Sequence, residues 1–183
     1  MEQALQAARR AISLDPMLAQ AYAIQSIVLS SMGEHDQAIA ALERVRVLNP
    51  SYSGNYFGAV LYRAGEPARA IEELNRQIKL DPYYPPATAG WLGAAYGRLE
   101  QYALAIPYLV EFVTRTPNNR HAHAWLTVTL AMMGDLDRAR KSAAEVLRID
   151  PNYRISTGLI GRFKRPEDMA YTVEALRRAG LPD

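Results

Sequence analysis

Cysteine is absent from the 183-residue chain, which excludes disulfide bridges and metal sites built on thiolates. Lysine is also scarce, with Lys79, Lys141 and Lys164 alone, and the formal net charge is only +2. A dedicated nucleic-acid-binding domain gathers many more basic side chains on one face. We therefore expect no nucleic-acid partner. The lack of cysteine fits a reducing compartment, and we expect a cytoplasmic protein.

The chain also lacks an apolar run long enough to cross a membrane. Its longest uncharged run extends from Pro16 to Gly33 and is interrupted by Gln20, Gln25 and Ser26. A membrane-spanning helix needs about 20 predominantly apolar residues. We therefore expect this run to be a helix packed within the protein, with no membrane insertion by this chain.

The motifs of common enzyme sites are missing too. The sequence holds no phosphate-binding G-x-x-x-x-G-K-[ST], no dinucleotide-binding G-x-G-x-x-G and no nucleophile elbow G-x-S-x-G. His121 and His123 are two residues apart, which on a helix turns their side chains about 200° from each other, whereas a shared metal needs a spacing of four. We expect no catalytic residue, no cofactor and no metal site. His35 lies in a Gly-Glu-His-Asp turn and is expected to face solvent.

What the sequence does contain is proline and alanine at a constant offset. Five prolines follow one another at steps of 34, 32, 35 and 34 residues, and an alanine lies twelve residues before each. These positions are Pro16, Pro50, Pro82, Pro117 and Pro151, with Ala4, Ala38, Ala70, Ala105 and Ala139. Gly33, Gly65 and Gly134 precede three of the alanines by five residues, and Glu100 takes that place once. A period near 34 residues indicates a repeat architecture.

Each of these recurring residues has a structural role. Between alanine and proline, apolar residues occur at helical spacing, as at Ala38, Leu42 and Val45. Proline cannot continue a helix and pushes its predecessor out of the helical region, so each helix should end before it. Glycine supplies the positive φ of a tight turn. Each unit is therefore predicted to be a helix, a glycine turn, a second helix and a proline turn.

The pattern resembles the tetratricopeptide repeat, whose unit has about 34 residues. The resemblance is fullest at Trp91-Leu92-Gly93, Tyr96, Tyr102, Ala105 and Pro117. It implies an all-α fold, namely a right-handed α-solenoid (superhelix) of stacked antiparallel helix pairs. It also implies a single domain, 1–183. Its predicted parts are the second helix of a truncated repeat (1–18), repeats at 19–52, 53–84 (short), 85–119 and 120–153, and atypical C-terminal capping helices at 154–183.

The two ends depart from the repeat. The helix expected over residues 1–14 has no partner helix before it and cannot bury its apolar stripe well, so we expect the chain to be a fragment of a longer protein. Residues 156–163 are predicted to form a shortened first helix, and Pro166 to open the last helix. The tail resembles the C-terminus of bacterial multidomain regulators in which an adenylate or guanylate cyclase-type domain precedes the repeats.

First helices line the concave surface of such an array. The alignment of the units predicts a peptide-binding groove formed by Asn55, Tyr62, Arg63, Arg98, His121, Val128 and Met132. The first helices carry few charges, and these are arginines, whereas acids such as Glu43 and Glu145 fall on second helices. We expect an apolar groove with a mildly positive rim that binds an apolar or acidic protein segment.

Several functions remain open on this evidence. The leading hypothesis is a non-catalytic protein–protein interaction scaffold, the C-terminal part of a larger bacterial regulatory protein. The alternatives are a self-association module that forms a homodimer, and a cis-regulator of a missing cyclase-type catalytic domain. The uncharged faces could also serve no partner and simply pack against neighbouring helices, because apolar helical faces usually belong to the core.

Overall fold

The computed structural model describes residues 1–52, 54, 56–158 and 162–183, and these residues form helices and turns without any β-strand. The prediction of an all-α fold built from helix pairs is confirmed. The described residues fall into two compact units. The first unit comprises residues 1–83 and the described part of 161–165, and the second comprises the rest of the described chain. None of the helices in the described part combines the length and apolarity needed to cross a bilayer.

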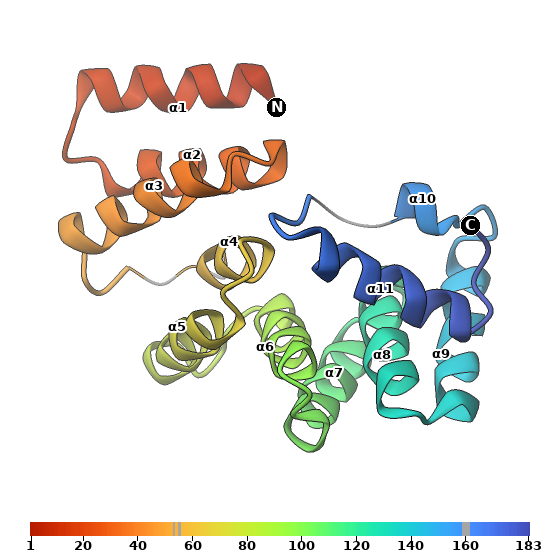
Figure 1. Cartoon of the computed structure of the whole chain (residues 1–183). Helices are drawn as coiled ribbons and strands as arrows, with labels where there is room; N and C mark the ends of the chain where they lie inside the picture. The colour runs from red at the N-terminus through yellow and green to blue at the C-terminus, as the bar shows by residue number, and fades with distance from the viewer. Residues whose placement is uncertain (53, 55, 159–161) are drawn as a thin grey trace. The chain divides into compact units, whose positions relative to one another are not determined.

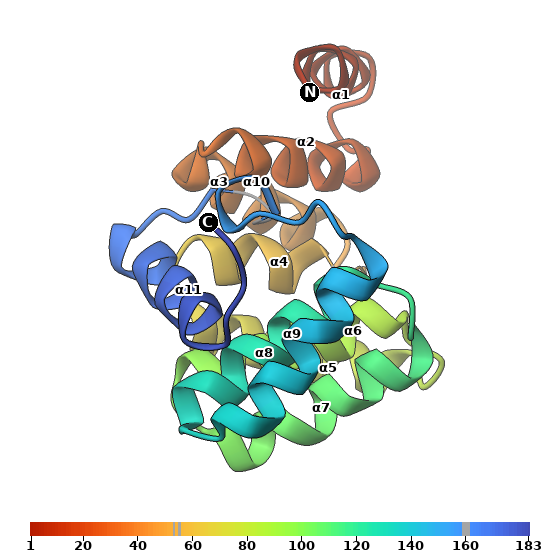
Figure 2. The same cartoon turned by 90° about the vertical axis from the view of Figure 1, so that its right-hand side faces the viewer.

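The first unit is built around two helix pairs. Its helices are α1 (Glu2–Leu14), α2 (Ala19–Met32), α3 (His35–Leu48), α4 (Tyr56–Arg63) and α5 (Pro67–Leu80) (Figure 1). α2 pairs with α3 and α4 with α5, while α2 also contacts α4 and α1. Figure 2 shows α1 almost end-on beside α2.

The second unit repeats this plan and adds a C-terminal helix. Its helices are α6 (Pro86–Arg98), α7 (Tyr102–Arg115), α8 (Arg120–Met133), α9 (Leu136–Ile149), α10 (Ile155–Gly158) and α11 (Pro166–Arg178). α6 pairs with α7 and α8 with α9. α8 also contacts α6, α7 and α11. α11 is thus the helix that is added to the two pairs.

The turns inside the pairs form as predicted. Gly33, Gly65 and Gly134 have φ values of 92°, 80° and 95°, in the left-handed region that favours glycine. Glu100 has a φ of 58° at the matching place between α6 and α7. The paired helices therefore require this backbone conformation even where a side chain makes it less favourable.

In four of the five proline turns, a side-chain hydrogen bond explains why Asp or Asn precedes the proline. Four second helices end at a residue followed by Asp or Asn with extended backbone. Its side-chain oxygen accepts a hydrogen bond from the backbone N–H two residues further on, a local turn that Asp and Asn favour. These bonds run from Met17 to Asp15 (2.9 Å), Ser51 to Asn49 (3.1 Å), Tyr83 to Asp81 (2.9 Å) and Asn152 to Asp150 (3.2 Å).

The periodic alanines mark where the two helices of a pair meet. Ala38, Ala70, Ala105 and Ala139 are each 0% exposed. Ala4, the fifth of the series, lies on α1 and is exposed, because no helix of the described chain covers this face of α1. The alanine series thus singles out α1 as a second helix with an open face.

The predicted helix over residues 156–163 is wrong at its C-terminal end. The described helix α10 ends at Gly158, and Arg162 and Phe163 are not helical, while 159–161 lie outside the described residues. The backbone N–H of Lys164 donates to the carbonyl of Arg63 (2.9 Å), a bond that holds this stretch against the first unit. α11 begins at Pro166, as predicted.

Candidate functional site

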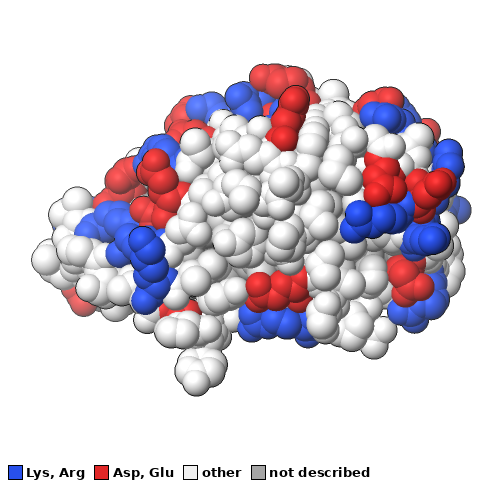
Figure 3. Space-filling model, turned by 90° about the horizontal axis from the view of Figure 1, so that it is seen from below, with Lys and Arg blue, Asp and Glu red and all other residues white. Residues whose placement is uncertain are grey.

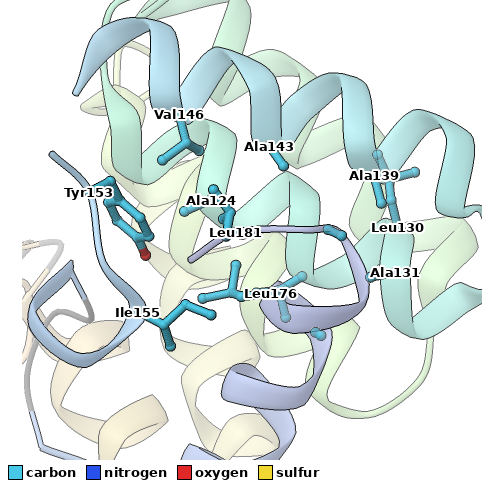
Figure 4. Packing of buried hydrophobic residues seen from close by; sticks show 13 residues of the cluster. Ala124, Leu130, Ala131, Ala139, Ala143, Val146, Tyr153, Ile155, Leu176 and Leu181 are labelled. Atoms are coloured by element: carbon cyan, nitrogen blue, oxygen red, sulfur yellow. The ribbon is translucent and has the colours of Figure 1, made fainter. Parts of the chain in front are cut away.

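Two predicted groove residues of the second unit, Val128 and Met132, pack together with α11. Val128 and Met132 on α8 pack in the same apolar cluster as Leu176 of α11. Figure 4 shows this cluster, in which Leu181 lies beside Ala124 and Leu176 lies close to Leu181. Leu176 is 0% exposed, so this contact is part of the core of the unit.

Arg98, the last residue of α6, binds an acid of the chain itself. Its Nε donates to Oδ1 of Asp168, in the first turn of α11, at 2.8 Å. The Asp168 side chain is only 2% exposed and that of Arg98 15%. The guanidinium of Arg98 also lies 4.4 Å from the ring centroid of Tyr171, whose hydroxyl donates to the carbonyl of Gly97 (3.2 Å). The carboxylate expected from a partner is thus supplied by α11.

His121 is half-buried in the first turn of α8. Its backbone N–H donates to Oδ1 of Asn119, which caps the helix (2.9 Å). Burial, and then the charge of Arg120, lower the pKa of the imidazole from 6.5 to about 4. His121 is therefore neutral at pH 7 and adds no positive charge to this part of the unit.

This pKa predicts a pH dependence of stability. Because the folded-state pKa lies below the unfolded value, the unfolded chain binds the proton first as the pH falls. The contribution of His121 is complete above pH 6.5 and is lost as the pH falls toward 4. Allowing for solvent screening of a half-buried group, we expect the loss to be about 1–2 kcal/mol.

The measurement compares urea unfolding of the wild type and of His121→Gln at about pH 7.5 and about pH 4.5. Wild type should lose more free energy of unfolding than His121→Gln over this interval. Equal losses in the two proteins would show that His121 titrates near its ordinary pKa.

Tyr62 and Arg63, the predicted groove residues of the first unit, meet the chain segment 162–165. The ring of Tyr62 packs edge-on against that of Phe163, with centroids 5.8 Å apart and planes at 70°. Arg63 is only 5% exposed, and burial lowers the pKa of its guanidinium. The expectation that Arg63 contributes to a solvent-exposed positive rim is wrong, because the end of α4 is covered. Asn55 lies outside the described residues, so its assignment stays a prediction.

The same segment places basic side chains at helix ends, with Arg162 at the C-terminal end of α2 and Lys164 beside the first turn of α3. Arg162 donates to the carbonyl of Met32, the last residue of α2 (3.4 Å), and Lys164 Nζ bonds Oδ1 of Asp36 (2.5 Å). A cation near the C-terminus of a helix interacts favourably with the helix dipole. The residues 162–165 therefore act as a short internal ligand of the first unit.

His35 was expected to face solvent, and this prediction is wrong. The residue is 5% exposed at the start of α3, and neither ring nitrogen has a hydrogen-bond partner. Burial, followed by the charges of Lys164 and Arg63, lowers its pKa. A turn that looks exposed in the sequence is covered here by a segment more than 120 residues away. No three His, Asp or Glu side chains among the described residues are placed to hold a metal ion.

The first unit has a hollow between α1 and α2. It has a volume of about 290 Å³ and is apolar, with lining residues that include Ala4, Ala7, Ala8, Ala11, Leu18 and Ile24. Leu18 and Ile24 are 41% and 42% exposed, so the hollow opens to solvent. Four alanines lie on the face of α1 that borders the hollow, and their methyl groups are too small to fill the space.

Sequence reasoning did not name this hollow, although a signal for it was present. Ala4 holds the same offset from Pro16 that Ala38 holds from Pro50. In α3 that alanine is covered by α2, and in α1 it borders the hollow. The alanine face of α1 is therefore the place where a helix-receiving surface is left open.

A sequence profile described as Tetratricopeptide repeat matches residues 25–85 and 92–154, more than half of the chain. No curated protein matches the sequence. The matched residues include most of the two helix pairs of each unit.

Several solved structures share the fold. YrrB, described as a TPR protein with an unusual peptide-binding site, is 24% identical, with 96% of this chain and 92% of that chain covered and a TM-score of 0.63. PilW, a widely conserved type IV pilus biogenesis factor, is 18% identical, with 97% and 80% covered and a TM-score of 0.75. A MamA double mutant is 21% identical, with 82% and 85% covered and a TM-score of 0.65. At these identities the likeness shows the fold.

Proposed function

Since the chain belongs to the tetratricopeptide repeat family, we propose that it is a non-catalytic scaffold for protein–protein interaction. We propose further that it binds an apolar helical segment of a partner protein in the hollow between α1 and α2. The single observation that carries this proposal is the open alanine face of α1.

The repeat itself indicates what covers such a face. On α3, α5, α7 and α9, the alanine of the periodic series is fully buried against the first helix of the pair. α1 presents the same face, with Ala4, Ala8 and Ala11 at helical spacing, and the hollow lies beside it. The occupant that fits is therefore a helix.

The lining of the hollow sets the chemistry of that helix. Its walls are methyl groups of α1 together with Leu18, Ala21, Ile24 and the polar Gln20, and no charged side chain is among these lining residues. Burying apolar surface there contributes about 25 cal/mol per Å². A volume near 290 Å³ calls for bulky apolar side chains on the partner, because alanines on both helices would leave the space unfilled.

The groove predicted from the sequence takes another role in this proposal. Tyr62, Arg98, Val128 and Met132 serve the chain's own C-terminal segment, and Asp168 supplies the acidic group that Arg98 binds. The sequence predicts a bound segment that is apolar or acidic. We propose that the apolar segment comes from a partner protein and binds between α1 and α2, whereas the acidic group is Asp168 of the chain's own α11. The peptide-binding site of YrrB, a protein of the same fold, agrees with a scaffold role.

The narrower hypotheses stay predictions. These are the single domain 1–183, the origin of the chain in a larger bacterial regulatory protein, and the regulation in cis of a cyclase-type catalytic domain.

The binding proposal can be tested with a random peptide library. Peptides of 14 residues, the length of α2, are displayed on phage and selected against the full chain. We expect selected peptides to carry large apolar residues at helical spacing, and to shift the NMR signals of Ala8 and Ile24. Filling the hollow by Ala7→Leu should weaken their binding about tenfold or more, because it removes the space for one side chain.

A matched control uses the same substitution elsewhere in the first unit. Ala68, on α5, is exposed like Ala7 but lies away from the hollow. Ala68→Leu should leave the affinity unchanged. Peptides that bind Ala7→Leu as tightly as wild type, or that shift signals of other helices only, would contradict the proposal.

A further inference from the structure

The outer face of α7 differs from that of the other second helices. Between Tyr102 and Arg115 the only charged residues are Glu111 and Arg115 itself. By contrast, α3 carries four Asp, Glu, Lys or Arg residues, α5 five and α9 six. A surface helix of a globular protein ordinarily presents charged residues to solvent. The exposed side of α7 therefore has the composition of a contact surface.

The exposed residues of α7 form one continuous apolar stripe. Leu104 is 51% exposed and Val110 42%, and Ala103, Pro107 and Thr114 are exposed as well. At 100° per residue these five side chains fall within an arc of about 120° centred on Pro107. Figure 3 views the side on which α7 lies in Figure 1, and it shows an area free of Lys, Arg, Asp and Glu that charged side chains surround.

The arrangement of this stripe is symmetric about Pro107. Leu104 lies three residues before Pro107 and Val110 three residues after it. In an antiparallel pair of identical helices with a two-fold axis at Pro107, Leu104 of one copy faces Val110 of the other, twice. This is the self-complementary pattern that a two-fold interface requires.

The charges at the two ends of α7 favour the same orientation. Glu100 is exposed just before α7, and Arg115, whose side chain is 35% exposed, is its last residue. In the antiparallel pair Arg115 approaches Glu100 of the second copy at each end. A parallel pair would instead bring Glu100 beside Glu100 and Glu111 beside Glu111, which is unfavourable. Antiparallel helix dipoles add to this preference.

The one acid on the stripe is already neutralised within the chain. Glu111 accepts hydrogen bonds from the hydroxyl of Tyr84 (2.9 Å) and from Arg115 (2.9 Å). Its carboxylate can therefore lie against Ala103 of a second copy without becoming a buried charge lacking hydrogen bonds.

We propose that α7 is a homodimer interface, and that two copies of the chain pack antiparallel through the outer faces of α7. This face belongs to the second unit, so the inference is independent of the binding proposed between α1 and α2. The dimer uses a single helix pair, and such a small interface gives a weak, reversible association.

Disulfide trapping tests the proposal sharply because the chain has no cysteine. Pro107→Cys places one thiol on the axis and should give a covalent dimer on mild oxidation. Leu104→Cys alone should cross-link poorly, since the two thiols lie about 9 Å apart along the helices. A mixture of Leu104→Cys and Val110→Cys should cross-link to a heterodimer. In a parallel pair, Leu104→Cys alone would cross-link best.

Sedimentation equilibrium of proteins that carry no introduced cysteine gives a second measurement of dimerisation. Wild type should show a monomer–dimer equilibrium, and Leu104→Glu should weaken it about tenfold or more, since it buries a charge at the contact. The matched control is Val47→Glu on the outer face of α3, where Val47 is 70% exposed. It should dimerise like wild type.

Three results would overturn the proposal. The first is a wild type that stays monomeric up to roughly 500 µM, beyond the range expected for a specific dimer. The second is a cross-linking yield of Pro107→Cys no higher than that of Ala40→Cys, an exposed site on α3. The third is a dimer that Val47→Glu weakens as much as Leu104→Glu does.

Discussion

Replacing Arg98 by alanine is expected to lower the free energy of unfolding by about 3–5 kcal/mol, because the buried Asp168 carboxylate loses the guanidinium that faces it. The carboxylate is 2% exposed, so water does not take the place of the lost partner. The cation–π contact between Arg98 and Tyr171 disappears at the same time. Chemical denaturation of the full chain, followed by circular dichroism, measures the effect.

An exposed ion pair provides the control. Arg148 bonds Glu145 on α9, with side chains 55% and 42% exposed. Arg148→Ala should change the free energy of unfolding by less than about 1 kcal/mol, as exposed ion pairs generally do. Replacing Arg98 and Asp168 together by Met and Leu should restore most of the loss, because the desolvation of both charges is removed. A loss under 1 kcal/mol for Arg98→Ala would mean that the ion pair between Arg98 and Asp168 contributes little to the stability of the fold.

Leu109→Ala is expected to cost about 2–5 kcal/mol, because it opens a cavity where α6 and α7 are closely packed. Leu109 is 0% exposed. A Cβ on Gly93 of α6 would lie only 2.6 Å from its Cγ and 3.0 Å from the carbonyl oxygen of Ala105. Glycine is therefore required at position 93, and the surrounding backbone leaves little room to close a cavity at Leu109.

The opposite face of the same helix should respond differently. Leu104 is 51% exposed, and Leu104→Ala should change the free energy of unfolding by less than about 0.5 kcal/mol when measured at a concentration where the chain is monomeric. Similar losses for the two substitutions would show that the outer face of α7 is part of the core. That result would also remove the basis for dimerisation through α7.

The helix pairs could be predicted because their signals are local. Proline ends a helix through its own ring, and glycine permits the φ of 92° seen at Gly33 through its missing side chain. The constant offset of alanine from proline reflects contact between neighbouring helices, which repeats every 34 residues or so. Even the exception at Glu100 occupies the predicted turn.

The candidate site could be predicted only in part. The sequence predicts a partner-binding groove on the weakly charged first helices, or else packing of these faces against neighbouring helices, and Val128 and Met132 do pack in one cluster with α11. The covering segments themselves were not foreseen, because Arg98 and Asp168 are 70 residues apart and no periodic pattern links them. A signal for the hollow beside α1 was present at Ala4, which continues the alanine series at the same offset from its proline as the four buried members.

The amino-acid sequence alone determined that this protein contains a series of α-helical pairs, where the paired helices end and which face of each second helix receives its partner. These properties depend on steric effects and hydrogen bonds within a few residues, repeated along the chain. Only the tertiary structure decided that α11 covers Val128 and Met132, that residues 162–165 lie on Tyr62, and that the alanine face of α1 stays open. Such contacts join residues far apart in the chain, and their free energy depends on which surfaces become buried together.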